Sequence, residues 1–178
     1  MDSFTRLALQ AGGGDTRALG RFVEAGYQEV WRFCASLVGA KEADDLCQEV
    51  FARAVKGLPT FRGDSSARTW VLSIARHTCA DELRASSRRR SQAPVAGSEH
   101  VTVADASGEV TVADLIGQLD DDRRTAFVLT QVVGLSYAEA ARVCDCPIGT
   151  IRSRVARARA DLVSLMRSAG ELQHRRHA

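Results

Sequence analysis

Arginine side chains recur closely in one segment of the C-terminal half of the chain. They stand at Arg152, Arg154, Arg157 and Arg159. Guanidinium groups pair with guanine edges and with phosphates, and an α-helix that carries them fits the major groove of DNA. The segment therefore predicts a DNA-reading helix; the alternative is an arginine-rich surface helix of a bundle. At 100° per residue, the packing face holds Ile148, Ile151, Val155 and Ala158, and the outer face holds Gly149, Ser153, Ala156, Arg157 and Ala160.

The residues before this helix have the pattern of a helix-turn-helix. Ser136 and Glu139 form a capping box, in which the serine oxygen accepts a backbone amide hydrogen bond and the glutamate reaches back. A short helix is expected to follow, with residues 144–146 as the turn. Pro147 suits the first position of the next helix, where no amide hydrogen is required.

Charge is divided unevenly along the 178 residues. Residues 61–90 carry 7 basic and 3 acidic side chains, residues 91–122 carry 7 acidic and no basic ones, and residues 123–178 carry 10 basic and 4 acidic ones. Clustered basic residues gain affinity for a polyanion by releasing its counterions. The charge pattern alone fits either a nucleic-acid partner or two solvated faces joined by an acidic linker.

Enzymatic chemistry finds little support in the sequence. The chain has no glycine-rich phosphate loop and no Ser/His/Asp or Cys/His constellation that spacing supports. We therefore expect no catalytic residue, no cofactor, no small-molecule substrate and no metal. The five cysteines form neither a disulfide framework nor a zinc pattern, and with no long apolar run we expect a cytoplasmic protein without a membrane segment. These cysteines are Cys34, Cys47, Cys79, Cys144 and Cys146.

Three amphipathic helices are expected before residue 91. Asp15 or Thr16 caps the first, which ends at Gly39, and the second runs from about Lys41 to Lys56. The third is capped by Ser65 or Ser66 and ends in the basic run 88–90. Apolar residues recur at three- and four-residue steps and no useful stretch alternates, so the fold class is all-α.

The chain divides into two small helical domains. Residues 91–111 are rich in Ser, Ala, Gly and Asp, which predicts a flexible acidic linker. The first domain is 1–90 and the second is 112–170. We expect the polar residues 171–178 to form a disordered tail.

Four stretches resemble the sigma-70 family, and more narrowly its extracytoplasmic-function (ECF) sigma factors. Residues 134–141 (GLSYAEAA) and 145–154 (DCPIGTIRSR) are similar to sigma region 4. Residues 43–51 (ADDLCQEVF) are similar to region 2.2, and residues 61–70 (FRGDSSARTW) to the segment that joins promoter melting to −10 recognition. The stretches occur in the family's order and spacing, and the resemblance covers most of the chain.

The resemblance implies a subunit that binds core RNA polymerase and directs promoter-specific transcription initiation. Region 2 (1–90) would bind polymerase and open the −10 element, and region 4 (112–170) would read the −35 element. Family analogy implies contacts with the β′ clamp helices and the β flap of polymerase, with promoter DNA, and with an anti-sigma factor. The polymerase-binding residues would be Asp44, Asp45, Gln48, Glu49 and Arg53.

The same resemblance assigns the promoter contacts. A loop from Phe61 would capture a flipped base of the −10 element, and the exposed face of the third helix would hold the adjacent DNA. The −10 residues would be Phe61, Arg62, Asp64, Ser65, Arg68, Arg76, His77, Asp81, Arg84, Arg88 and Arg89, and the −35 residues Thr150, Arg152, Ser153, Arg154, Ala156 and Arg157.

Two other classes of function compete with this interpretation. A free-standing helix-turn-helix regulator would bind operator DNA without polymerase, usually as a dimer, and the chain shows no dimerisation segment. A protein that only sequesters polymerase would bind it without opening promoters.

Overall fold

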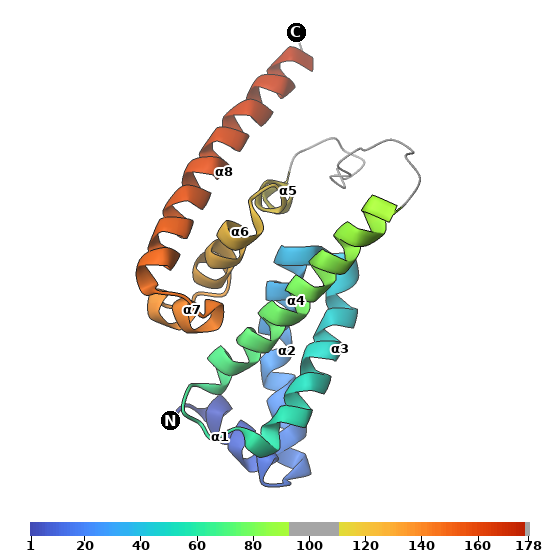
Figure 1. Ribbon diagram of the computed structural model, residues 1–178, viewed down its shortest axis with the longest axis vertical. Helices are drawn as coiled ribbons and strands as arrows, with labels where there is room; N and C mark the ends of the chain where they lie inside the picture. The colour runs from blue at the N-terminus through green and yellow to red at the C-terminus, as the bar shows by residue number, and fades with distance from the viewer. Residues whose placement is uncertain (93–110, 177–178) are drawn as a thin grey trace.

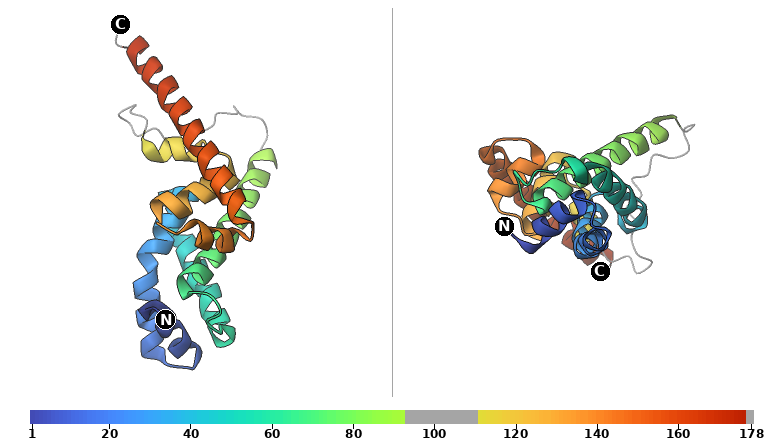
Figure 2. Two further views of the ribbon diagram at one scale, coloured as in Figure 1. Left: turned by 90° about the vertical axis from the view of Figure 1, so that its left-hand side faces the viewer. Right: turned by 90° about the horizontal axis from the view of Figure 1, so that it is seen from below.

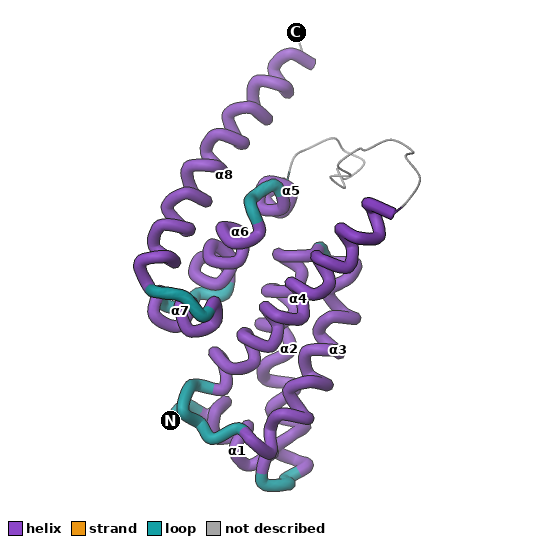
Figure 3. Tube along the Cα trace, in the orientation of Figure 1, coloured by secondary structure: helices purple, strands orange, loops and turns teal. Residues whose placement is uncertain are grey.

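The computed structural model describes residues 1–92 and 111–176, and these form two helical units that lie side by side (Figure 1). In the first unit, three long helices form a bundle and a short helix crosses its lower end. The described residues contain helices and short loops with no strand (Figure 3), as the expected all-α class requires. The elements of the first unit are α1 (Ser3–Gly12), α2 (Thr16–Val38), α3 (Ala40–Gly57), η1 (Leu58–Thr60) and α4 (Ala67–Gln92).

Local sequence signals set the ends of the long helices. The Asp15 carboxylate accepts hydrogen bonds from the second and third amides of α2, which would otherwise lack partners. Gly39 has φ 103°, a conformation that a side chain disfavours, and it separates α2 from α3. The Ser66 hydroxyl accepts from the Thr69 amide at the start of α4. The three predicted helices are confirmed.

The core of the first unit lies between α2, α3 and α4. Phe22 and Phe33 of α2 are fully buried, as are Val50 of α3 and Cys79 of α4. Phe22 contacts Phe51 edge-on, with ring centroids 6.2 Å apart. Burial of these side chains at three- and four-residue spacing is the reason that the three helices form one bundle.

The second unit contains the predicted helix-turn-helix. The capping box is present: the Ser136 hydroxyl accepts from the Glu139 amide, and the Glu139 carboxylate accepts from the Ser136 amide. Asp145 takes the left-handed conformation (φ 50°) that turns the chain between the two helices. The elements are α5 (Val112–Gly117), α6 (Asp121–Phe127), a π-helical turn η2 (Val128–Val132), α7 (Tyr137–Cys144) and α8 (Ile148–Arg176).

The two units are packed against each other, with α7 beside α4, and α5 and η2 beside α2 (Figures 1 and 2). Three arginines bridge them by donating to main-chain carbonyls. Arg68 donates to Val133 O (2.7 Å), Arg76 to Val143 O (2.8 Å) and Arg124 to Leu37 O (2.9 Å). Each acceptor lies near the end of a helix, where carbonyls lack partners within the helix.

Several details differ from the expectations. Helix α1 was not among the expected helices. Ile148 was expected on the packing face but is 40% exposed, because α8 begins there. A disordered tail was expected from residue 171, but α8 continues through residues 171–176. Their Glu, Leu, Gln and Arg residues have high helix propensity. Most of the linker (93–110) and the last two residues lie outside the described residues.

Candidate functional site

Helix α8 presents the predicted DNA-reading face to solvent. Arg152, Ser153, Ala156 and Arg157 are all exposed. Ile151, on the opposite face, is fully buried, and Val155 and Ala158 lie beside it in the same core. The amphipathic pattern therefore fixes the rotation of the helix, so that two arginines and two small residues project together.

Two other residues predicted on this helix lie at its margin. Arg154 forms an ion pair with Asp122 at the start of α6, and its side chain is 24% exposed. Thr150 is half-buried, and its carbonyl accepts from the Ser153 hydroxyl (2.9 Å). Arg154 therefore joins α8 to α6, while Arg152 and Arg157 project freely from the outer face.

The predicted polymerase-binding residues form the exposed face of α3. Asp44, Asp45, Gln48 and Glu49 are all exposed. The Asp44 carboxylate oxygen Oδ1 accepts two hydrogen bonds from α2, from Tyr27 Oη (3.0 Å) and Trp31 Nε1 (2.9 Å). The same contact raises the pKa of Tyr27, chiefly through its hydrogen bond to Asp44.

Tyr27 and Trp31 thus belong to this surface, although neither was predicted from the sequence. Both side chains are half-buried, so their rings are held while their polar atoms reach Asp44. Their four-residue spacing, which places both on one face of a helix, was the available signal. Trp and Tyr are enriched among the residues that contribute most to protein–protein binding.

Residues predicted for polymerase and for DNA meet in one charged network between α3 and α4. Arg53 donates to Glu49 (2.7 Å) on its own helix and to Asp81 (3.4 Å) on α4. Arg84 donates to Asp81 from one turn further along (2.6 Å). The hydrogen bonds from Arg84 and Arg53 lower the pKa of Asp81, whose side chain is exposed. Asp81 therefore positions two arginines, and its negative charge faces them.

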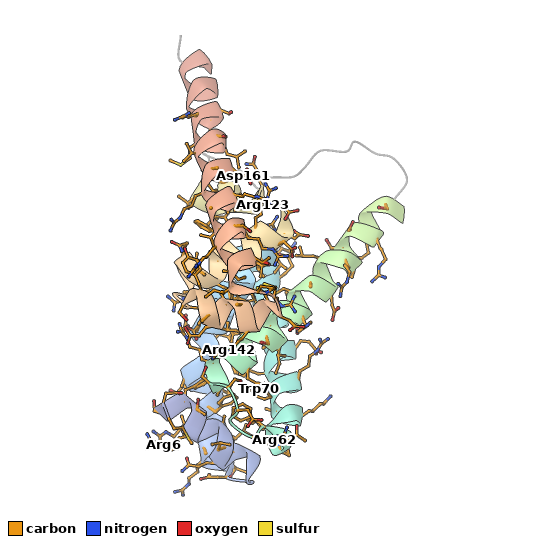
Figure 4. All side chains as sticks on the ribbon, turned by 60° about the vertical axis from the view of Figure 1, so that its left-hand side comes forward. Arg6, Arg62, Trp70, Arg123, Arg142 and Asp161 are labelled. Carbon is orange, nitrogen blue, oxygen red and sulfur yellow. The ribbon has the colours of Figure 1, made fainter. Side chains whose placement is uncertain are left out.

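The predicted −10 loop has fixed ends and an exposed centre. Phe61 packs on Trp70 of α4, with ring centroids 4.8 Å apart, and its amide donates to Leu58 O (3.0 Å). Arg62 and Asp64 face solvent, with side chains 84% and 81% exposed, and Ser65 is half-buried. Figure 4 shows Arg62 projecting from the lower end of the molecule, near Trp70.

The residues predicted at the start of α4 are engaged in the packed arrangement. Arg68 pairs with Glu29 of α2 and also reaches Val133 of the second unit. Arg76 reaches Val143 and contacts the ring of His77, which also bonds Ser73 O. The structure therefore places these two arginines at the junction of the two units. Further along α4, Arg88 and Arg89 are exposed, and Arg89 pairs with Glu82.

The cysteines of the first unit meet inside the bundle. Cys34, Cys47 and Cys79 come from α2, α3 and α4, all three are fully buried, and the Cys79 thiol donates to Cys34 Sγ (3.6 Å). The hydrogen bond to Cys34, together with burial, raises the pKa of Cys47. Such thiols are poor nucleophiles. Among residues 1–92 and 111–176, no group of three Cys, His, Asp or Glu side chains has the arrangement of a metal site.

Comparison with protein families gives two matches, one in each unit. Residues 22–89 match the model described as "Sigma-70 region 2", and residues 110–162 match the one described as "Sigma-70, region 4". The first range contains the acidic face of α3, the loop and most of α4, and the second contains α7 and the first half of α8. Helix α1 lies outside both.

Relatives and solved structures agree with these matches. The chain is 48% identical over 168 residues to the "ECF RNA polymerase sigma factor SigC" of Mycobacterium tuberculosis, covering 92% of this chain and 91% of that one. It is 33% identical to the "ECF RNA polymerase sigma-E factor" of Escherichia coli K12, covering 82% and 85%. The structure of CnrH in complex with the cytosolic domain of CnrY has a TM-score of 0.73 at 28% identity, covering 94% and 99%. That of RpoE with the anti-sigma factor NepR from Bartonella quintana has a TM-score of 0.68 at 28% identity, covering 83% and 96%.

Proposed function

The chain belongs to the sigma-70 family, as an ECF sigma factor that binds core RNA polymerase and directs promoter-specific transcription initiation, and we propose how its two units divide this work. Residues 1–90 dock on polymerase and open the −10 element, and residues 112–170 read the −35 element. The outer face of α8 carries the proposal, because Arg152 and Arg157 project beside the small side chains of Ser153 and Ala156. Small side chains allow the helix backbone to approach the floor of the major groove.

Polymerase binding is assigned to the acidic face of α3. Asp44, Asp45, Gln48 and Glu49 present oxygen acceptors along two turns, which suits a helical partner with basic side chains such as the β′ clamp helices. Arg53 contributes to polymerase binding by fixing the Glu49 carboxylate through their ion pair. The β flap is the proposed partner of the second unit.

The −10 element is assigned to the loop and to α4. The exposed loop centre, with Arg62 and Asp64, would meet the separated strand, and Phe61 would provide a ring for a base to stack on. Ser65, His77, Asp81 and Arg84 supply polar groups beside it, and Arg88 and Arg89 supply phosphate contacts.

Promoter binding requires the two units to separate. Arg68 and Arg76 donate to carbonyls of the second unit in the packed arrangement, so the same guanidinium groups are unavailable to DNA. Polymerase binds both units at a fixed separation, and this binding would supply the free energy that separates the two units. The two DNA contacts then become effectively intramolecular, so neither unit needs high affinity alone.

Three further assignments complete the proposal. The chain is not an enzyme, since nucleotidyl transfer belongs to polymerase. It acts in the cytoplasm, where polymerase is found; no helix within the described residues is long and apolar enough to cross a membrane. An anti-sigma factor is a proposed partner, because RpoE of Bartonella quintana, which has a similar fold, was solved with one.

The test is a comparison of Arg157→Ala with Gln48→Ala in a reconstituted transcription assay. We expect the first to weaken −35-dependent transcription about tenfold at unchanged polymerase affinity. The second should lower polymerase affinity and leave promoter preference intact. Arg167→Ala, an exposed arginine of α8 beyond the proposed face, is the control. Equal loss of polymerase binding in the Arg157 and Gln48 variants would contradict the division.

A further inference from the structure

Helix α1 contacts the loop between α3 and α4 at three points, all from one face. Thr5, Leu9 and Gly12 are spaced at intervals of four and three residues, which places them in one stripe. The Thr5 hydroxyl accepts from the Ala67 amide at the start of α4 (2.9 Å). Gly12 lies so close to the end of α3 that a Cβ there would be 2.5 Å from Leu58 O. Between these points, the Leu9 methyl groups lie against Gly63.

The Thr5 hydroxyl is held in one orientation. Its proton is donated to Asp2 Oδ2 (2.7 Å), and the other Asp2 oxygen accepts from the Thr5 amide (2.8 Å). A lone pair of the hydroxyl therefore remains for Ala67. Thr5 is 3% exposed and Ala67 is fully buried, so water has no access to replace the bond.

These contacts fix the ends of the loop and place Leu9 against its backbone at Gly63, while the side chains at its centre stay exposed. Leu58 and Ala67 are buried against α1, while Arg62 and Asp64 between them face solvent. In Figure 4, Arg6 of α1 and Arg62 of the loop lie at the same end of the molecule. A binding loop whose ends are already ordered loses less conformational entropy when it captures a ligand.

We propose that α1 is a positioning element for promoter opening, and that Thr5 holds the −10 loop in its strand-capturing geometry through the Ala67 amide. The inference deepens the proposed function and rests on it. It assigns a role to residues that lie outside the region 2 match, which begins at residue 22. Thr5 is a positioning residue and has no contact with DNA in this scheme.

The central experiment compares Thr5→Val with Thr5→Ser in holoenzyme made with core polymerase. Valine keeps the shape of threonine and removes the hydroxyl, whereas serine keeps the hydroxyl. The readout is permanganate reactivity of −10 thymines in a promoter fragment that the wild-type holoenzyme transcribes, with polymerase affinity measured in parallel. We expect Thr5→Val to reduce promoter opening about tenfold at unchanged polymerase affinity. Thr5→Ser should open the promoter as the wild-type protein does.

Two further variants separate positioning from stability. Thr78→Val removes another buried hydroxyl of the same unit, one that donates only to Ile74 O within α4, and should leave opening unchanged. Gly12→Ala keeps the Thr5 hydroxyl but forces Leu58 to move, and should reduce opening as Thr5→Val does. Hydrogen exchange of residues 58–67 in the free protein should accelerate in Thr5→Val and Gly12→Ala alone.

The outcomes distinguish this inference from the proposed function. Wild-type opening by Thr5→Val, or equal losses in Thr5→Val and Thr78→Val, would overturn the role of α1 and leave the sigma-factor assignment intact. Failure of the wild-type holoenzyme to transcribe or melt any fragment of a genomic promoter pool, from which the test fragment is chosen, would overturn both.

Discussion

Arg124 offers the most direct way to separate the two units without touching a proposed binding residue. Its side chain is 12% exposed, and Nη1 donates to Leu37 O in the last turn of α2. Nη2 donates within its own unit, to Gly117 O and Leu119 O. Only the bond to Leu37 crosses between the units, and the cationic group also lies favourably at the carboxyl end of a helix.

Replacing Arg124 by Met keeps much of the apolar stem and removes the charge. A hydrogen bond to a charged group contributes about 1.5–3 kcal/mol to stability. Arg124 Nε is buried without a hydrogen-bond partner, which costs free energy, so its removal offsets part of the loss. A net weakening of the packed state by about 2 kcal/mol shifts the equilibrium between packed and separated units about 30-fold. We expect the radius of gyration from small-angle scattering to increase in the free protein.

The neighbouring residue provides the control. Arg123 pairs with Asp161 of α8 within the second unit (2.7 Å), and Figure 4 shows the two side chains together. Arg123→Met therefore removes an arginine of the same helix without a cross-unit bond. Unchanged scattering for Arg124→Met, or the same increase in both variants, would refute the idea that Arg124 holds the units together.

Two further outcomes are expected. Asp2→Ala should destabilise the protein by about 1 kcal/mol at pH 6 through loss of the α1 cap. Hydrogen bonds from Thr5 lower the pKa of Asp2, so the stabilisation by Asp2 is present above the usual pKa of 3.8 and is lost as the pH falls below that value. Thermal unfolding of the wild-type protein and of Asp2→Ala should therefore show a smaller difference in stability at pH 3 than at pH 6. A difference that grows at pH 3 would contradict the assignment. Trp31→Phe removes one of the two hydrogen-bond donors to Asp44 and should weaken core polymerase binding roughly threefold to tenfold at unchanged promoter preference. Titration of labelled core polymerase measures the affinity. An unaltered affinity would exclude Trp31 from the polymerase-binding surface.

Local signals in the sequence predicted the long helices well. Asp15, Gly39 and Ser66 act within a few residues of the helix ends that they define, so their effects are visible in the sequence itself. The capping box at Ser136 is of the same kind. The buried stripe of α8 also follows from periodicity, and it set the outer face on which the proposed −35 residues lie.

Contacts between distant residues were beyond the reach of such signals. Helix α1 is short and ends at the first of three consecutive glycines, and its role depends on Ala67, which lies 62 positions from Thr5. The cross-unit arginines donate to main-chain carbonyls, which every residue carries and no pattern distinguishes. Arg154 was predicted as a −35 residue, but its ion pair with Asp122 joins residues 32 positions apart and leaves no local signal in the sequence.

Run-off transcription shows directly whether this protein directs polymerase to specific promoters. Purified core polymerase would be incubated with this protein and a pool of genomic promoter fragments from the source bacterium. We expect discrete transcripts that require the protein and whose promoters share −10 and −35 elements. Polymerase that binds the protein yet initiates no such transcript would contradict promoter-directing activity, and an absence of binding would favour an operator-binding regulator.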